Sequence, residues 1–452
     1  MTTIFADEAL LPGGFAKNIR VTLRGDGRID RVVHGREAPG DLRVSTLLPA
    51  PINLHSHAFQ RAMAGLTERR GRERDTFWTW RALMFDFLDR LTPDDVEAIA
   101  ALVQVEMLEA GFGGLAEFHY LHHQPGGAPY AALSEMSARV VAAAEVSGIG
   151  LTLLPVHYAV GGCDGRPLAP GQVRFGNDLD RFAALYAEAE NAVAALPDGA
   201  IGLAPHSLRA VPRGDFDGLI RLTKGPIHMH LAEQGPEVDE VLAAWGARPV
   251  TWALDHLPIN QRWCLIHTTQ MTPDETTALA ATGAVSGLCP ITESSLGDGI
   301  FDGARFLEAG GRFGVGSDSN VRISLAEELR TLEYSQRLRD RGRAVLASAD
   351  RSTGRVLFEG AVAGGAQAAG RETGVIAQGA LADLLALDGT HIDLDGRSGD
   401  RVLDAFVFCG DQTMVNHVWS GGRHVVDGGR HVAREAVVAR YRAVMARLLA
   451  DL

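Results

Sequence analysis

Runs of consecutive apolar residues recur along the middle of the chain, and each run is followed by a segment with helical character. Continuous apolar strands separated by helices are typical of a parallel sheet that is covered on both faces. Eight such units, without a Gly-x-Gly-x-x-Gly turn after the first strand, favour a (β/α)8 TIM barrel of the α/β class over an open nucleotide-binding sheet. The predicted strands are 46–54, 113–118, 150–156, 200–204, 225–231, 262–266, 284–288 and 312–316.

Two of the predicted helices carry clear start and stop signals. Thr92 is followed by a proline and two acidic residues, which suit an N-cap and a first helical turn, and Gly111 suits the end of the same helix. Thr272 begins an equivalent pattern that ends at Gly283. These helices follow apolar runs, as the alternating pattern of a barrel requires.

The two ends of the chain have a different pattern. Residues 2–44 read as short strands with tight turns, and similar strands follow Gly379, at 382–387, 415–419 and 421–426. We therefore predict three parts. They are a small β-sandwich domain from residues 1–46 plus 375–430, a metal-dependent catalytic barrel at 47–374, and a C-terminal helix at 431–452.

Composition and charge narrow the class of protein. The balance of 46% hydrophobic and 22% charged residues is that of a soluble globular protein. The formal charge of −13 argues against a nucleic-acid or anionic-membrane partner. No apolar run approaches the roughly 18 residues that cross a bilayer, and the first residues do not resemble a secretory signal. We expect a cytoplasmic protein.

The cysteines offer no metal site of their own. Cys163, Cys264, Cys289 and Cys409 are widely spaced, and none forms a Cys-x-x-Cys pair. This spacing excludes a cysteine-based zinc site and fits a reducing compartment. We expect four buried, inert thiols.

Polar side chains follow every predicted strand, and at least six of the 16 histidines lie at such positions. Barrel enzymes build their sites at the carboxyl ends of the strands, so these side chains are expected to meet. In strand order they are His55 and His57; Glu117, His119 and Tyr120; His157 and Tyr158; His206 and Arg209; His230 and Glu233; His267; Thr292 and Glu293; and Asp318.

Four of these residues form a plausible metal site. His55 and His57 are two positions apart, which places both imidazoles on one face of a strand. With His230 and Asp318 they supply three imidazoles and one carboxylate, a donor set suited to zinc. The strand-four end reads Leu-Ala-Pro-His and has no lysine to bridge two ions, so we expect one Zn2+ or similar divalent metal per chain.

Glu233 and His267 are the candidates for proton transfer. Glu233 lies three residues after His230, close enough to reach a metal-activated water without being a ligand. For His267 three interpretations stay open: a fifth ligand, a group that orients a ligand, or an electrostatic partner of developing charge.

The combined pattern resembles the mononuclear aminohydrolase branch of the amidohydrolase superfamily. More narrowly, the stretches 53–65, 77–81 and 316–324, running on through 327–330, resemble the formimidoylglutamate deiminases of histidine degradation, and the similarity extends over nearly the whole chain. The resemblance implies hydrolysis of N-formimino-L-glutamate to N-formyl-L-glutamate and ammonia. By the same analogy, the substrate-binding residues would be Gln60, Arg81, Tyr120, His206 and Arg209.

This substrate agrees with independent reasoning about charge. A small-molecule dicarboxylate needs fixed cations in its pocket, and arginine forks pair with carboxylates better than lysine does. In the implied mechanism a metal-activated water attacks the formimino carbon, His267 and Asp318 orient the water and take its proton, and Glu233 protonates the departing nitrogen. The division of proton transfer among these three residues stays open. We also expect a homodimer.

Two rival functions remain. A purine, pterin or triazine ring deaminase of the same superfamily would rely on aromatic stacking and amide contacts rather than paired arginines. A barrel that has lost catalysis would usually show eroded ligands, whereas here every candidate ligand and Glu233 are present. The residues, and not the fold, decide among these functions.

Overall fold

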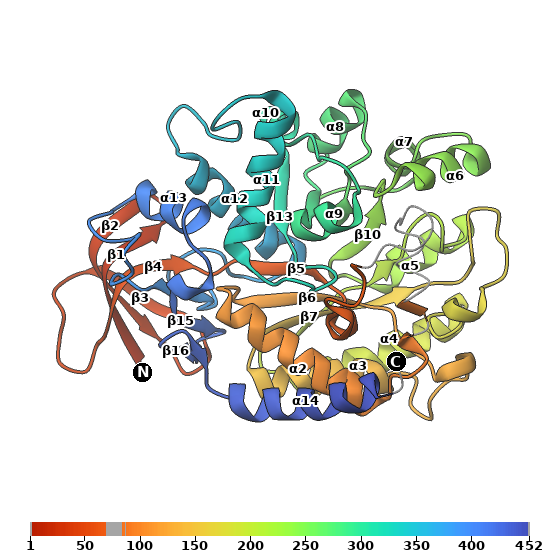
Figure 1. Cartoon of the computed structure of the whole chain (residues 1–452), viewed down its shortest axis with the longest axis horizontal. Coiled ribbons are helices and arrows are strands. Elements are labelled where there is room, and N and C mark those ends of the chain that lie inside the picture. Colours follow the sequence, from red (N-terminus) through yellow and green to blue (C-terminus); the bar gives the residue numbers. More distant parts are fainter. Residues whose placement is uncertain (1, 69–83, 86, 451–452) are drawn as a thin grey trace.

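The structure is a computed structural model that describes residues 2–68, 84–85 and 87–450 (Figure 1). Within these residues, parallel strands form two sheets, in the spatial orders β5-β6-β7-β8 and β10-β11-β12-β13, and β9 pairs with β7. Neighbours in each sheet are consecutive along the chain, as βαβ units require. The strands are β5 Ile52–Ser56, β6 Gly114–His119, β7 Gly150–His157, β8 Ala200–Ile201, β9 Ala204–Pro205, β10 Ile227–Leu231, β11 Trp263–His267, β12 Val285–Leu288 and β13 Arg312–Val315.

Isolated parallel bridges connect the two sheets at both edges. Leu203 pairs with Ile227 between the β8–β9 segment and β10, and Ser56 pairs with Asp318 between β5 and the end of β13. At this second edge the His57 N–H also donates to the Asp318 carbonyl, 2.9 Å away. The protein is therefore of the α/β class, and the first and last parallel strands meet beside the predicted metal ligands.

Helices follow the parallel strands, and α12 packs closest to them. Gly364 of α12 lies directly over Phe313 of β13, where an added Cβ would collide with the Phe313 carbonyl group, so only glycine permits this approach. The helices are α2 Pro93–Glu109, α3 Glu135–Ser147, α4 Leu179–Val193, α5 Phe216–Leu222, α6 Gly235–Trp245, α7 Pro249–His256, α8 Pro273–Ala280, α9 Pro290–Leu296, α10 Gly303–Glu308, α11 Leu325–Asp340, α12 Thr353–Ala369, α13 Asp400–Phe408 and α14 Arg434–Leu449.

Both predicted capping patterns are confirmed. Thr92 caps α2 and Thr272 caps α8. In each helix the threonine hydroxyl accepts a hydrogen bond from the backbone N–H three residues later, and the carboxylate of that residue, Asp95 or Glu275, accepts one from the threonine N–H. No helix in the described ranges is long and apolar enough to cross a membrane.

Two strand predictions differ from the structure. The predicted strand 46–54 is two strands, β4 Leu42–Pro49 and β5, which belong to different sheets. The break lies at Ala50 and Pro51, where proline cannot donate to a ladder and the Ala50 N–H bonds instead to the Asp383 carbonyl. The predicted strand 200–204 is likewise split into β8 and β9. Gly202 lies between them, where an added Cβ would collide with the Pro226 carbonyl of the next unit.

Strands from the two ends of the chain form one mixed sheet. Among the described residues its order is β17-β16-β15-β14-β4-β1-β2-β3, so a block of C-terminal strands joins a block of N-terminal strands at the β14–β4 pair. The sandwich arrangement stays a prediction. The predicted β segment 375–430 also contains α13, which its apolar pattern did not reveal. The strands are β1 Thr2–Leu11, β2 Gly14–Leu23, β3 Ile29–His34, β4, β14 Leu384–Leu387, β15 Val415–Ser420, β16 Arg423–Asp427 and β17 Arg430–His431.

Helix α14 lies along α2 on the outside of the molecule (Figure 1). Three arginines of α14 form ion pairs with acidic residues at the start and end of α2: Arg447 with Asp95, Arg440 with Glu97, and Arg434 with Glu109. Helix α14 lies within the segment 431–452 predicted as a C-terminal helix, and it covers a helix that follows the first parallel strand.

Candidate metal centre and active site

One pocket at the carboxyl ends of the parallel strands gathers most of the predicted site residues. Its empty space of about 540 Å³ is partly open to solvent, and its wall combines histidines, acids, one arginine and several aromatic rings. Arg81 lies outside the described residues. The lining residues are His57, Gln60, Met84, Tyr120, Tyr158, Phe175, His206, Arg209, His230, Glu233, His267, Thr292, Leu296, Asp318 and Ser319.

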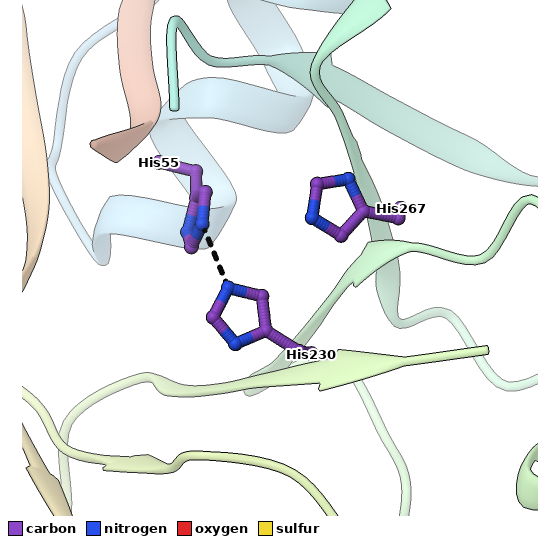
Figure 2. A group of neighbouring side chains, drawn as sticks. All are labelled: His55, His230 and His267. Carbon is purple, nitrogen blue, oxygen red and sulfur yellow. Dashed lines mark hydrogen bonds between the residues drawn. The ribbon is translucent and has the colours of Figure 1, made fainter. Parts of the chain in front are cut away.

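The four predicted metal ligands converge on one side of this pocket. The Nε2 atoms of His55 and His230 are 3.1 Å apart, as the dashed line in Figure 2 marks. Asp318 Oδ1 lies 3.4 Å from His57 Nε2 and 3.7 Å from His55 Nε2. Zinc–nitrogen bonds of about 2.0–2.1 Å place tetrahedral ligand atoms about 3.3–3.4 Å apart, so these separations suit one zinc-sized ion.

Backbone carbonyls set the orientation of two of these imidazoles. His57 Nδ1 lies 3.0 Å from the Phe118 carbonyl oxygen, and His230 Nδ1 lies 3.1 Å from that of His206. A carbonyl only accepts, so each Nδ1 carries the proton and each Nε2 presents a lone pair to the centre. Lone pairs this close repel unless a cation lies between them. The donor set therefore fits a divalent metal.

Burial keeps these imidazoles neutral, as ligands must be. It lowers the pKa of His57 to about 3, and it lowers the pKa of His55 and His230 well below the ordinary value. The carboxyl group of Asp318 responds in the opposite sense, because burial raises its pKa to about 7 although the neighbouring His267 lowers it.

His267 stands in an acidic environment between the metal ligands and Glu233. Its Nε2 is 3.7 Å from Asp318 Oδ2 and 3.8 Å from Glu233 Oε1, and its Nδ1 is 3.2 Å from Glu293 Oε1. Burial alone would lower its pKa, but these three carboxyl groups outweigh burial and raise it to about 10. The ring also lies within ligand distance of His55 and His230 (Figure 2), so the geometry alone is compatible with ligation as well.

The backbone is unusual where these side chains leave their strands. Ala232, His267 and Asp318 all have positive φ angles, of 53°, 71° and 45°. Residues other than glycine adopt this conformation rarely and at a cost, and such residues cluster at functional sites. Here the strained backbone follows β10, β11 and β13, at the positions that direct polar side chains into the pocket.

Glu233 and Arg209 face each other in the wall of the pocket. Arg209 NH2 lies 3.7 Å from Glu233 Oε2, and both side chains are buried. Burial by itself would lower the pKa of the Arg209 guanidinium, but Glu237 and Glu233 raise it, so the cation is retained. Glu237 in turn accepts from the backbone N–H groups of Ala232 and Glu233, which holds this turn in place.

Gln60, Tyr120 and His206 also lie in this wall. Gln60, on the short helix Ala58–Met63 after β5, donates through Nε2 to the Tyr120 hydroxyl at 2.9 Å. Its Oε1 atom is buried and has no hydrogen-bond partner within the described part of the chain. His206 Nδ1 lies 3.0 Å from the Ser207 hydroxyl. The pocket thus offers a buried amide acceptor beside a buried cation.

Not every polar residue at a strand end belongs to this site. His119 and His157 lie outside the pocket lining, and His157 Nε2 instead pairs with Asp215 at 2.9 Å. Glu117 supports the site from behind, because it accepts from the Ala58 N–H at 2.6 Å, and burial raises its pKa to about 8. Strand-end position predicts proximity to the pocket but not the direction of the side chain.

Three contributors to the site had been given no role from the sequence, although two of them lie at predicted strand ends. Glu293 orients His267, and its position after the seventh strand was a visible signal. Tyr158 follows the third strand and lines the pocket wall, where its hydroxyl accepts from Gln172 at 2.6 Å. Phe175 lies in the long connection between β7 and α4 and packs its ring 4.8 Å from that of Tyr120. No periodicity in the sequence marks that position.

Comparison with known proteins agrees with this geometry. The model of the amidohydrolase family matches residues 46–425, and that of the formimidoylglutamate deiminase HutF N-terminal domain matches residues 1–44. The formimidoylglutamate deiminase of Pseudomonas aeruginosa is 45% identical over 453 residues, covering 99% of this chain and all of that protein.

Solved structures show the same relationship. The crystal structure of an amidohydrolase from Brucella melitensis superimposes with a TM-score of 0.96 at 46% identity, over 99% of this chain and 100% of that one. An adenosine deaminase from Xanthomonas campestris with bound zinc has a TM-score of 0.83 at 20% identity, over 99% and 98% of the two chains, which shows a shared fold. With a family match over most of its length and a relative at 45% identity, the chain belongs to the amidohydrolase family.

Proposed function

We propose that this protein hydrolyses N-formimino-L-glutamate to N-formyl-L-glutamate and ammonia. The observation that carries the proposal is the conjunction of a three-histidine, one-aspartate donor set with a buried arginine in a single pocket. The full-length likeness to a formimidoylglutamate deiminase supports the same substrate. The reaction would place the enzyme in histidine degradation.

We further propose that the two parallel sheets form one closed (β/α)8 barrel. The bridges at both edges support closure, because an open sheet would leave two unpaired edge strands. The proposed division of the chain is a small domain from 1–46 plus 375–430, a catalytic barrel at 47–374, and a C-terminal helix at 431–452. A sandwich arrangement of the small domain and a homodimeric assembly remain parts of this proposal.

His55, His57, His230 and Asp318 would hold one zinc-like ion. When bound, such an ion polarises a water molecule and lowers its pKa toward neutrality. The adenosine deaminase with the same fold contains zinc, which supports this choice of metal. His267 is then left as an orienting and electrostatic group, because Glu293 holds its Nδ1 and the four other side chains would already hold the ion.

The proton transfers fall to the acidic side chains around His267. Asp318 and His267 lie 3.7 Å apart and can together orient the attacking water and take its proton. Glu233, 3.8 Å from His267, can receive that proton and deliver it to the departing nitrogen, so that ammonia leaves from the tetrahedral carbon.

Substrate recognition would rest on charge at one end and hydrogen bonding at the other. Arg209 is a buried cation that can pair with a substrate carboxylate by two parallel hydrogen bonds. The buried Gln60 Oε1 is a suitable acceptor for an N–H of the formimino group. Tyr120 and His206 complete the wall, and Arg81 is proposed as the second carboxylate-binding cation from the family resemblance.

Ammonia release from formiminoglutamate, measured beside a panel of purines, pterins and triazines, tests this proposal. We expect activity on formiminoglutamate and none on the rings. Preference for a ring substrate would instead support a ring deaminase, whose stacking surface could come from Tyr120, Tyr158 and Phe175. Absence of all activity in a metal-loaded protein would support a barrel without catalysis. Light scattering on the same preparation tests the homodimer.

A further inference from the structure

We propose a second divalent-metal site, on the sheet formed by the chain ends, built from His417, His424 and Asp427. His417 Nδ1 lies 3.2 Å from His424 Nε2 and 3.2 Å from Asp427 Oδ1, and the three ligand atoms lie within 4.8 Å of one another. Two of these separations are close to the edge of about 3.3–3.4 Å expected around a tetrahedral zinc ion. The site shares no residue with the barrel pocket.

A register shift in the β15–β16 hairpin creates this cluster. His424 and Asp427 are three positions apart, and in a regular strand they would point to opposite faces of the sheet. The pairing shifts between Val418 and Trp419, so that Trp419 pairs with His424 while Val418 pairs with Val426. Such a bulge inserts one unpaired residue and realigns the strand beyond it.

The buried side of the hairpin shows the same realignment. Val425 and Val426 are consecutive, yet both belong to the large core shared with the parallel strands. The residues that flank them, His424 and Asp427, are therefore both left on the other face, with His417 and Trp419 of the neighbouring strand. The bulge leaves one residue of β16 unpaired and brings three candidate metal ligands to one face of the sheet. A hairpin with regular pairing would not place them together.

Neighbouring rings and burial hold the donors in position. The His424 ring stacks on the buried Trp419 ring, 4.7 Å away and inclined by 15°, and His417 is itself buried. Asp427 supplies the charge, and the exposure of His424 and Asp427 leaves room for water to complete the coordination.

Two imidazoles and one carboxylate select borderline divalent ions such as Zn2+ over Mg2+ or Ca2+. The ion would clamp β15 to β16, so it would act on the stability of the sheet and not on turnover. Because a bound ion stabilises only the folded state, the melting temperature should rise as this site fills.

Equilibrium dialysis of the full-length protein against Zn2+ tests the site. Wild type should take up two equivalents: one that is lost in His230→Ala and one that is lost in His424→Ala. Loss of an outer hydrogen-bond partner already weakens metal sites 10–100-fold, so loss of a direct ligand should weaken this one by about 100-fold or more. Asp427→Asn, which keeps the shape of the side chain, should also weaken it and keeps the test valid if a histidine variant folds poorly.

The matched control is His34→Ala, an exposed histidine at the end of β3 in the same sheet, which should retain both equivalents. The variants at 417, 424 and 427 should keep wild-type kcat. They should lose only the rise in melting temperature that wild type shows when the second equivalent of Zn2+ binds. Uptake of a single equivalent by wild type, retention of the second by His424→Ala, or its loss in His34→Ala would each overturn the proposal. None of these results depends on which substrate the barrel accepts.

Discussion

Glu233 lies between Arg209 and His267 and is close to both. Its carboxylate oxygens lie 3.7 Å from the Arg209 guanidinium and 3.8 Å from the His267 ring. None of the four proposed metal ligands has its ligand atom paired with Glu233. The residue therefore can be changed without removing a metal ligand, which makes its contribution to proton transfer separable from metal binding.

Glu233→Gln should keep its metal and lose turnover. The amide has nearly the same shape but cannot carry a proton between water and the leaving nitrogen, so kcat should fall by about 10²-fold or more. Metal content measured beside steady-state ammonia release checks this expectation. A near-normal kcat would mean that another residue, His267, carries the proton. Loss of the metal would show that Glu233 is needed to assemble the site.

Arg209 tests the identity of the substrate. In Arg209→Ala a substrate carboxylate would be left unpaired in a buried pocket, at a cost of about 2–5 kcal/mol in transition-state binding. Arg209→Lys should recover only part of this, because an ammonium group cannot form the two parallel bonds of a guanidinium. The measurement is kcat/KM for formiminoglutamate, with Arg81→Ala in parallel.

A carboxylate-free formamidine is the control substrate for this series, because its kcat/KM should be insensitive to the arginines. Metal content should equal that of wild type in all three variants. If Arg209→Ala, Arg209→Lys and Arg81→Ala all act on formiminoglutamate like the parent enzyme, the dicarboxylate is not the substrate, and a ring deaminase becomes the leading function.

At the level of secondary-structure elements, one buried ionic cluster attaches the terminal sheet to the parallel strands. Arg371, just after α12, contacts Asp198 before β8 at 2.9 Å and Asp383 before β14 at 3.3 Å. Arg423 of β16 also contacts Asp198, at 2.9 Å. Ser420 extends the attachment, because it accepts from the Gly150 N–H and donates to the Gly113 carbonyl.

Arg371→Ala should therefore destabilise the whole protein. Removing one partner of a buried pair leaves Asp383, whose side chain is 0% exposed, without its countercharge, at a cost of about 3–5 kcal/mol in the free energy of unfolding. Urea unfolding of the metal-loaded protein measures the difference. Arg305→Ala, which removes a half-exposed arginine paired with Asp302, is the control and should cost about 1 kcal/mol or less. Equal losses in the two variants would mean that the cluster does not anchor the sheet.

At the scale of the whole molecule, the metal would join strands from distant parts of the chain. His55 and His57 come from the first parallel strand, His230 from β10 and Asp318 from the end of β13. An ion that binds all of them stabilises only the folded arrangement, by about 4 kcal/mol when its free concentration is 1,000 times the dissociation constant.

Purified protein should accordingly hold one ion at this centre, which His230→Ala should lose. Removal of metal by a chelator should lower the melting temperature of wild type by more than that of His230→Ala, which keeps only the ion held by His417, His424 and Asp427. Elemental analysis and calorimetry on the same samples check both statements. Two ions that both depend on His55, His57 and His230 would contradict a mononuclear centre.

Local signals in the sequence predicted a large part of this architecture. Apolar runs located most of the parallel strands because a strand buried on both faces has no polar positions. The caps at Thr92 and Thr272 depend on residues within one helical turn, so they were visible in the same way. The pocket histidines and acids followed from their spacing at strand ends, where neighbouring parallel strands must place their carboxyl termini together.

Contacts between distant segments decided the rest. The division of 46–54 between two sheets depends on Asp383, more than 300 positions away, and the separation of His57 from His157 depends on which way each ring turns at its strand end. The Arg371 cluster and the pairing of His424 with Asp427 arise from packing and from a register shift. A sequence pattern records burial and local geometry; side-chain direction and partner choice are set only when the chain has folded.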